Sequence, residues 1–401
     1  MTTLKQTTTR AKAIAALAAL AAIPAFGVSA FGVSGAMAQE TVTLGIVTAQ
    51  TGPLAAPGRF QMNGFDLAVQ AINEAGGFEV DGETHMLDLQ VYDTRCNAAE
   101  GASAMQRLAT VDQVPVVLGE LCSPVAAAEA PIAADFGVPL VLTVPTAPNL
   151  TEQGNEWLFR VNPNNFQLNE ALAAFVAENG WSPLSFIAWN NDAGRGGVNG
   201  MRELLPDDVE FGYVGYFNVG EVDFSSHIAN IRNEGSEAIM LLMDEEPGAL
   251  AIRQIRDAGL DAQLVGTLAM GSSRFLDRLN ADYLNGMAQY NAFPPNAPIP
   301  RIEEFSALYE AAYGEESHGF AAQSYDGIFV VIAAMQAAGT VSDSAAIRDA
   351  LAAISWDGVI GPIRFNENNQ AEPPVYITQW CDDGTRRILF PDDLAADCGF
   401  G

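Results

Sequence analysis

Residues 114–144 read VPVVLGELCSPVAAAEAPIAADFGVPLVLTV, and this stretch indicates the fold. Two apolar runs, VPVVLGEL (114–121) and VPLVLTV (138–144), enclose an alanine-rich segment that starts at Ser123-Pro124. Serine as the N-cap and proline at the first helical position are typical of a helix start. Continuous apolar runs are typical of strands that are covered on both faces, as in parallel sheets. The stretch therefore predicts a strand, a helix and a second, parallel strand.

The same alternation extends in both directions along the chain. Upstream, the strands VTLGIV (42–47) and MLDLQVYD (86–93) each precede a helical pattern. Downstream, a second series begins after FRVNP (159–163). Its expected helices lie near 166–179, 196–205, 224–234 and 247–258, and its expected strands are LSFIAW (184–189), EFGYVGYF (210–217), AIMLLM (238–243) and QLVGTL (263–268). Two such series predict an α/β protein with two doubly wound, Rossmann-like lobes.

The chain is strongly acidic. Its 401 residues include 49 Asp and Glu against 19 Lys and Arg, which gives a formal net charge of −30. Nucleic acids and anionic membrane surfaces need a basic footprint, so the charge argues against both as partners. The apolar share of 49% is enough for a large core. Binding of a small ligand does not require such an excess of acid, so we interpret it as a surface adaptation to a salty medium.

The first 38 residues have the pattern of a secretory signal peptide. Three basic residues among the first twelve are followed by an uncharged stretch, residues 13–39, that contains the small-x-small sequence Ala36-Met37-Ala38. This pattern predicts cleavage after Ala38 and export to the periplasm. An uncleaved membrane anchor is the alternative, because the uncharged stretch is long enough to span a bilayer. No cysteine stands near Ala38, so we expect no lipid anchor.

All four cysteines, Cys96, Cys122, Cys381 and Cys398, lie beyond the predicted cleavage site. An even number of cysteines in an exported chain favours disulfides. Proximity along the chain favours the pairs Cys96 with Cys122 and Cys381 with Cys398. Three histidines and the lack of a Cys-x-x-Cys motif argue against a zinc site, and we expect neither a metal nor a cofactor.

The polar residues that follow the predicted strands are candidates for a ligand site, because open α/β sheets bind ligands beyond the carboxyl ends of their strands. These residues are Gln50, Thr51, Ser123, Thr143, Thr146, Asn190, Asn191, Asp192, Asp244, Glu245 and Glu246. Ser123 is either a plain helix cap or a hydroxyl that helps to hold a carboxylate. The acidic run 244–246 is either a solvated loop or a site for a metal or for acid-base chemistry.

Enzyme motifs are missing at the strand-to-helix junctions. The sequence has no G-x-S-x-G elbow, Walker loop, H-E-x-x-H motif or G-x-G-x-x-G loop there. Gly194-Arg195-Gly196-Gly197 follows a strand but lacks the lysine of a phosphate loop, so we expect it to form a tight turn beside a cleft. We therefore expect a binding protein and not an enzyme, with a secreted hydrolase as the disfavoured alternative.

Nine short segments form a series along the chain. They are VTLGIVTAQTGPLAAPG (42–58), AINEAGG (71–77), VYDTRC (91–96), VVLGELCSPV (116–125), PTAPNLT (145–151), VDFSSHIANIRNEGSEAIML (222–241), IRQIRDAGL (252–260), QSYDG (323–327) and GPIRFNENNQ (361–370). In this order the chain resembles the leucine/isoleucine/valine-binding family of type I periplasmic solute-binding proteins, the receptors of ABC importers.

This resemblance implies two lobes that close over a small molecule by hinge bending. Three crossovers would join them, near Val161, Phe293 and Asp357. Lobe 1 would then comprise residues 41–161 and 294–356, and lobe 2 residues 162–293 and 357–401. The resemblance also supports the disulfide between Cys96 and Cys122.

The resemblance further implies which residues bind the ligand. By position, Ser123 and Thr146 would hold the ligand's carboxylate, and Val144 would offer its backbone carbonyl. Leu121 and Cys122 would border the pocket for the ligand's side chain.

Three positions depart from the pattern of the family. Pro57 and Ala193 stand where aromatic residues are usual, and Leu268 stands where a glutamate pairs with the ligand's ammonium group. An ammonium group that is closed into a cleft needs an acidic partner, because an unpaired buried charge is costly. Asp244 or Glu245 is the candidate for this role.

The resemblance thus implies a monomeric periplasmic substrate-binding protein that delivers a small solute to the permease and ATPase subunits of an ABC importer. A branched-chain or other aliphatic amino acid is the first expectation for the solute. An amide or a small aromatic carboxylate is the alternative, favoured by Leu268, Pro57 and Ala193. A periplasmic module that reports its ligand to a membrane receptor would share the same fold and cleft.

Overall fold

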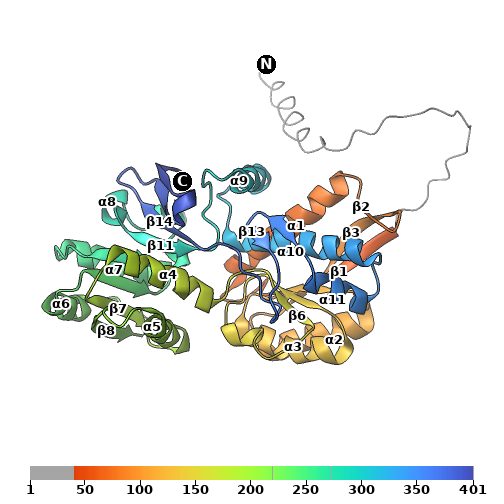
Figure 1. Cartoon of the computed structure of the whole chain (residues 1–401), viewed down its shortest axis with the longest axis horizontal. Coiled ribbons are helices and arrows are strands. Elements are labelled where there is room, and N and C mark those ends of the chain that lie inside the picture. Colours follow the sequence, from red (N-terminus) through yellow and green to blue (C-terminus); the bar gives the residue numbers. More distant parts are fainter. Residues whose placement is uncertain (1–39, 219, 272, 401) are drawn as a thin grey trace, which may run out of the picture. The chain divides into compact units, whose positions relative to one another are not determined.

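The computed structural model describes residues 40–218, 220–271 and 273–400 (Figure 1). The predicted signal peptide, residues 1–38, and its cleavage site lie outside the described residues. Two large sheets, with helices between their strands, make up the described part. The predicted α/β class is confirmed.

A six-stranded sheet carries the first series of strands. Their order is β2 (Phe78–Val80), β3 (Glu83–Asp93), β1 (Glu40–Thr48), β4 (Val117–Gly119), β5 (Leu140–Leu142) and β6 (Leu158–Arg160). All are parallel except β2, which pairs antiparallel with β3. Around β4, Val116 and Leu118 enter one apolar cluster and Val117 enters another. Because neighbouring side chains point to opposite faces, both faces of the sheet are covered, which explains the continuous apolar runs.

The helices that pack on this sheet come from both ends of the chain. They are α1 (Ala55–Glu74), α2 (Ala98–Arg107), α3 (Ser123–Phe136), α9 (Pro300–Tyr313), α10 (Gly319–Ala338) and α11 (Ser344–Ala352). Figure 1 shows α10 and α11, in blue, beside the early red and orange elements, and α10 packs against α1. We call the six-stranded sheet and these helices lobe 1.

An eight-stranded sheet carries the second series. Its order is β16 (Ala396–Phe400), β15 (Arg386–Phe390), β14 (Tyr376–Trp380), β11 (Ala288–Asn291), β10 (Gln263–Gly266), β9 (Ala238–Leu242), β7 (Leu184–Trp189) and β8 (Phe211–Phe217). Its helices are α4 (Asn165–Asn179), α5 (Asp192–Leu204), α6 (Ser225–Glu234), α7 (Glu245–Asp257) and α8 (Ala281–Leu284). The predicted strand LSFIAW coincides with β7. We call this sheet and these helices lobe 2; its antiparallel extension β14–β16 was not predicted.

A small hairpin, β12 (Trp356–Gly358) and β13 (Gly361–Ile363), lies between the last helix of lobe 1 and β14. The side chain of Asp326 on α10 accepts hydrogen bonds from Val359 N and Ile360 N, at 2.9 and 2.8 Å. Ile360 and Ile363 join the same apolar cluster as α1 and α10. The hairpin therefore packs with lobe 1, and Asp357, near which the third crossover is expected, lies within β12.

Two disulfides join the cysteines in the expected pairs. The Cα atoms of Cys96 and Cys122 are 5.6 Å apart, and those of Cys381 and Cys398 are 6.1 Å apart. Within the part of the chain that the structure describes, no cluster of His, Cys, Asp and Glu could hold a metal ion, and no helix is long and apolar enough to cross a membrane.

Candidate functional site

The loop after β4 leads into α3, and its first helical residue is Ser123. The prediction that Ser123 caps the helix is wrong: Cys122 occupies the cap position, in an extended conformation, and its side chain makes no capping hydrogen bond. The hydroxyl of Ser123 instead accepts a hydrogen bond from Ala147 N, at 3.3 Å. Ala147 lies in the loop after β5, next to Thr146. Two neighbouring strands thus bring the predicted residues Ser123 and Thr146 to one end of the lobe 1 sheet.

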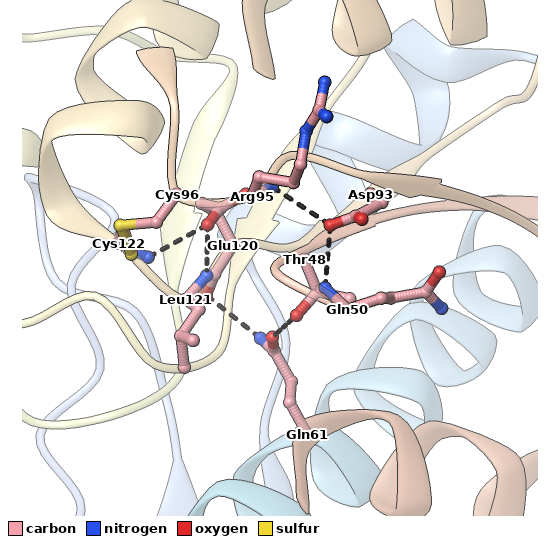
Figure 2. The surroundings of a disulfide bond; sticks show 9 residues. All are labelled: Thr48, Gln50, Gln61, Asp93, Arg95, Cys96, Glu120, Leu121 and Cys122. Carbon is pink, nitrogen blue, oxygen red and sulfur yellow. Dashed lines mark hydrogen bonds between the residues drawn. A yellow bond between two sulfur atoms is a disulfide. The ribbon is translucent and has the colours of Figure 1, made fainter. Parts of the chain in front are cut away.

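The side chain of Glu120, which is fully buried, bonds the loop that carries Leu121, Cys122 and Ser123. One carboxylate oxygen of Glu120 accepts from Leu121 N, at 2.8 Å, and from Cys122 N, at 3.0 Å (Figure 2). Burial raises the pKa of Glu120, and these N–H bonds oppose the rise. The disulfide to Cys96 fixes the same loop from the other side. The backbone around Leu121 and Cys122 is therefore rigidly placed.

Gln61 on α1 connects three strand ends of lobe 1. Its amide nitrogen donates to the carbonyl of Glu120, at 3.0 Å, and to Thr143 Oγ1, at 2.9 Å. Its amide oxygen accepts from Thr48 Oγ1, as Figure 2 shows. Gln61 is fully buried, so this network ties the ends of β1, β4 and β5 together. Sequence reasoning missed Gln61 and Glu120; a polar residue within an apolar helix pattern was the available signal.

Asp93, at the end of β3, bonds the backbone of Gln50 and both the backbone and the hydroxyl of Thr51. It accepts from Gln50 N at 2.8 Å, from Thr51 N at 3.3 Å, and from the Thr51 hydroxyl. Although partial burial alone would raise it, these bonds leave the pKa of Asp93 below its ordinary value. The Thr51 hydroxyl is thus used to hold the loop at the end of β1.

In lobe 2, the two acidic candidates differ in their surroundings. The carboxylate of Glu245 forms an ion pair with Arg278 Nε, at 3.3 Å. Asp244 precedes α7, bonds no helix N–H with its side chain, and accepts from the Trp189 side chain. Burial raises the pKa of Asp244, and the bond from Trp189 opposes the rise. Burial, together with the charge of Asp244, raises the pKa of Tyr290 to about 12.

Asn190 and Asn191 stabilise the local structure of lobe 2. Asn190 accepts from Arg195 Nη2, at 2.6 Å, and Asn191 caps α5 by accepting from Gly194 N, at 2.9 Å. Residues 194–197 lie inside α5, so the predicted tight turn is wrong. Glycine is needed at position 194 for another reason: a Cβ atom there would lie 2.1 Å from the Trp189 carbonyl oxygen.

A small pocket, with about 50 Å³ of free interior volume and partly open to solvent, lies where residues of both lobes meet. Among its lining residues are Val144, Thr146, Asn162, Leu168, Leu268, Asn291, Phe293, His318, Phe320 and Gln323. Ser123, Leu121, Cys122, Asp244 and Glu245 are not among them. The described lining contains no Asp or Glu, and burial lowers the pKa of His318 to about 4, which keeps its ring neutral at neutral pH. The part of the cleft around Leu268 is therefore uncharged.

Comparisons with known proteins agree with this architecture. The family model described as periplasmic binding protein matches residues 41–385. A Leu/Ile/Val-binding protein homolog 3 of Brucella melitensis is 28% identical, over 86% of this chain and 93% of the relative. A leucine-, isoleucine-, valine-, threonine-, and alanine-binding protein of Pseudomonas aeruginosa is 25% identical, over 87% of this chain and 92% of the relative.

Solved structures show the same fold. The branched-chain amino acid transporter substrate-binding protein LivJ of Streptococcus pneumoniae, in complex with isoleucine, has a TM-score of 0.75 at 25% identity, covering 87% of this chain and 99% of that one. A solute-binding protein of an ABC transporter from R. palustris, in complex with benzoate, has a TM-score of 0.74 at 20% identity, covering 87% and 95%. The chain therefore belongs to the leucine/isoleucine/valine-binding family of type I periplasmic binding proteins, whose members are substrate-binding proteins of ABC transporters and not enzymes.

Proposed function

We propose that this chain is a periplasmic receptor that binds an aliphatic amino acid between its two lobes and delivers it to the permease and ATPase of an ABC importer. The observation that carries the proposal is the contact between Ser123 Oγ and Ala147 N, which places Thr146 beside the start of α3. Hydroxyls and N–H groups at a helix start are suited to a carboxylate. The names of the relatives support an amino acid as the bearer of that carboxylate.

For the ligand's ammonium group we propose Asp244 as the partner. The charge of Glu245 is already balanced by Arg278, at 3.3 Å, whereas none of the ion pairs among the described residues includes Asp244. A carboxylate held by one neutral donor, Trp189, keeps its charge available for a cation. Val144 is a weaker acceptor for the same group, because its carbonyl already accepts from Asn162 Nδ2, at 3.1 Å.

An aromatic carboxylate or an amide is the second candidate ligand. The uncharged pocket around Leu268, with Phe293 and Phe320 in its lining, favours a ligand without an ammonium group. A structural neighbour holds benzoate in the same fold.

The lobes, localisation and assembly complete the proposal. We place the third crossover near residues 371–375, after the hairpin β12–β13, so that lobe 1 comprises 41–161 and 294–371. Residues 1–38 are proposed to be removed as a signal peptide, leaving a monomer without a lipid anchor in the periplasm. Genes for a permease and an ATPase next to this gene would favour import over a sensory role.

Isothermal titration calorimetry against a ligand panel tests the proposal. The panel contains leucine, isoleucine, valine, alanine, leucinamide, benzoate and 3,4-dihydroxybenzoate. We expect leucine or a related amino acid to bind most tightly, and Asp244→Asn to weaken it far more than the matched variant Glu245→Gln. Preference for benzoate, with no effect of Asp244→Asn, would instead support the second candidate. If none of these compounds gave a heat of binding, both candidate ligand classes would be wrong.

A further inference from the structure

Arg160, the last residue of β6, is fully buried, yet the ion pairs found among the described residues do not include it. Burial lowers its pKa to about 10, and the charge of Glu152 counteracts this in part. The side chain therefore stays protonated at neutral pH. A buried cation without a paired anion is costly, so its hydrogen bonds must compensate.

These hydrogen bonds converge on the loop that carries Thr146. The guanidinium donates to the carbonyls of Ala147, at 2.6 Å, and of Pro145, at 3.4 Å, through Nη1. Nη2 donates to Thr151 Oγ1, at 3.1 Å, and to the carbonyl of Pro148, at 3.5 Å. One side chain thus holds three carbonyls of the segment 145–148.

The other carbonyls of this loop are bonded by the residues that follow Arg160. Asn162 Nδ2 donates to the carbonyls of Val144 and Pro145, at 3.1 and 3.3 Å. Asn165 N, at the start of α4 in lobe 2, donates to the carbonyl of Thr146, at 2.8 Å. Every carbonyl from Val144 to Pro148 is therefore bonded by residues 160–165, on the side of the hinge. Ala147 N points the other way, to Ser123.

The same guanidinium also contacts the third connection between the lobes. Arg160 Nε donates to Gln370 Oε1, and Gln370 Nε2 donates to the carbonyl of Asn162, at 2.9 Å. The backbones of Arg160 and of residues 369–371 pair as well: Arg160 N donates to Asn369 O and Ala371 N to Arg160 O. Two of the three expected crossovers and the Thr146 loop are thus joined around one buried charge.

We propose that Arg160 is a positioning residue for ligand binding: it holds the carbonyls of Pro145, Ala147 and Pro148, so that the N–H and the hydroxyl of Thr146 face the ligand's carboxylate. The peptide dipoles then present their positive ends to the cleft, and the buried positive charge behind them adds to the attraction. The loop and the two crossovers also move as one unit. Arg160 itself does not touch the ligand. This inference rests on the proposed function for its ligand.

Three variants separate this role from general stability. Arg160→Gln removes the charge and most of the donors, and Arg160→Lys keeps the charge without the fork of donors. Thr151→Val keeps the shape of the side chain but removes the hydroxyl that accepts from Arg160. This variant replaces Arg160→Gln in the test if Arg160→Gln does not fold. Arg256→Gln is the matched control, because Arg256 is a half-buried arginine of lobe 2 that bonds the carbonyls of Ala262 and Asn285, at 3.4 and 3.5 Å.

The first readout needs no ligand. Hydrogen exchange of residues 143–152 in the ligand-free protein should accelerate by about tenfold in Arg160→Gln, the effect of losing a charged hydrogen bond. Thr151→Val should accelerate it less, and Arg256→Gln not at all. Wild-type exchange rates in folded Arg160→Gln, or in Thr151→Val where Arg160→Gln does not fold, would overturn the positioning role.

The second readout is the affinity for leucine and for leucinamide, which lacks the carboxylate. We expect Arg160→Gln to weaken the binding of leucine by about tenfold and the binding of leucinamide much less. The loss of leucine affinity in Arg160→Lys should be smaller than in Arg160→Gln. If Arg160→Gln lost affinity equally for leucine and leucinamide, the charge of Arg160 would have no role in binding the carboxylate. If the wild type binds neither leucine nor benzoate, the proposed ligand class is wrong, while the exchange rates still decide whether Arg160 positions the loop.

Discussion

The guanidinium carbon of Arg274 lies 4.6 Å from the ring centroid of Phe60, and this contact joins lobe 2 to lobe 1. Arg274 follows β10, and Phe60 is on α1. Glu315, between α9 and α10, bonds both Arg274 and Arg59, and the His318 ring stacks on Phe60 at 4.4 Å. The described structure therefore holds its lobes together by a cation–π contact and an ion pair next to the pocket.

We expect Arg274→Gln to favour separated lobes. The substitution removes the contacts of Arg274 with Phe60 and Glu315, which form only when the two lobes are together. Such partly exposed contacts contribute about 1 kcal/mol. Small-angle scattering of the ligand-free protein should show a larger radius of gyration, and the ligand should dissociate faster. Arg202→Gln is the control, since Arg202 lies 4.6 Å from the Phe211 ring within lobe 2. An unchanged radius and dissociation rate would show that this contact does not hold the lobes.

Glu129 on α3 should destabilise the protein. It is fully buried, and neither carboxyl oxygen has a hydrogen-bond partner among the described residues. Burial, with a contribution from the nearby Glu120, holds the pKa of Glu129 well above its ordinary value. We expect Glu129→Met to raise the free energy of unfolding by about 1–3 kcal/mol at pH 7, the cost of a buried polar group without a partner.

The pH dependence provides the control. A carboxyl whose pKa is raised by folding binds more protons in the native state, so its contribution to stability falls as pH rises above the unfolded value. Urea denaturation of the wild type should therefore show a loss of stability as the pH rises above about 4, the ordinary pKa of a glutamate, and Glu129→Gln should reduce this loss. Identical pH profiles for the two proteins would contradict this account of Glu129.

Salt should stabilise the protein. If residues 1–38 are removed, 16 arginines against 49 acidic residues leave a net charge of −33 without a single lysine. Raising the salt concentration from about 10 mM to 1 M shortens the Debye length from about 30 to 3 Å, which screens the repulsion between these acids. Scanning calorimetry should show a rising melting midpoint over this range. A flat or falling midpoint would remove the interpretation of the charge as an adaptation to salt.

The parallel part of both sheets follows from the sequence because its strands are covered on both faces, and LSFIAW matches β7 to the residue. The antiparallel strand β14 was missed because it pairs with β11, more than eighty residues earlier in the chain. Such a pairing leaves no mark in local periodicity. The packing of the hairpin at 356–363 on α10 is equally absent from local periodicity, because Asp326 lies 33 and 34 residues before Val359 and Ile360.

The site candidates that the sequence indicates are residues that directly follow strands. Ser123 and Thr146 follow strands, and that position indicates a ligand site in this fold. Glu120 and Arg160 were not predicted, since in one sequence a buried polar residue resembles one on the surface; Gln61 left only the weak signal of a polar residue in an apolar helix pattern. Glu245 and Asp244 could not be distinguished either, because the partner of Glu245, Arg278, is distant along the chain.

Calorimetric titration of leucine into the wild type, Ser123→Ala, Thr146→Ala and the double variant tests the central claim most directly. We predict that each single variant loses about tenfold or more in affinity, as expected for a hydrogen bond to a charged group, and that the double variant loses more. The far-ultraviolet circular dichroism of the variants should stay that of the wild type. Unchanged affinity in both single variants would contradict the assignment of the carboxylate site to the ends of β4 and β5.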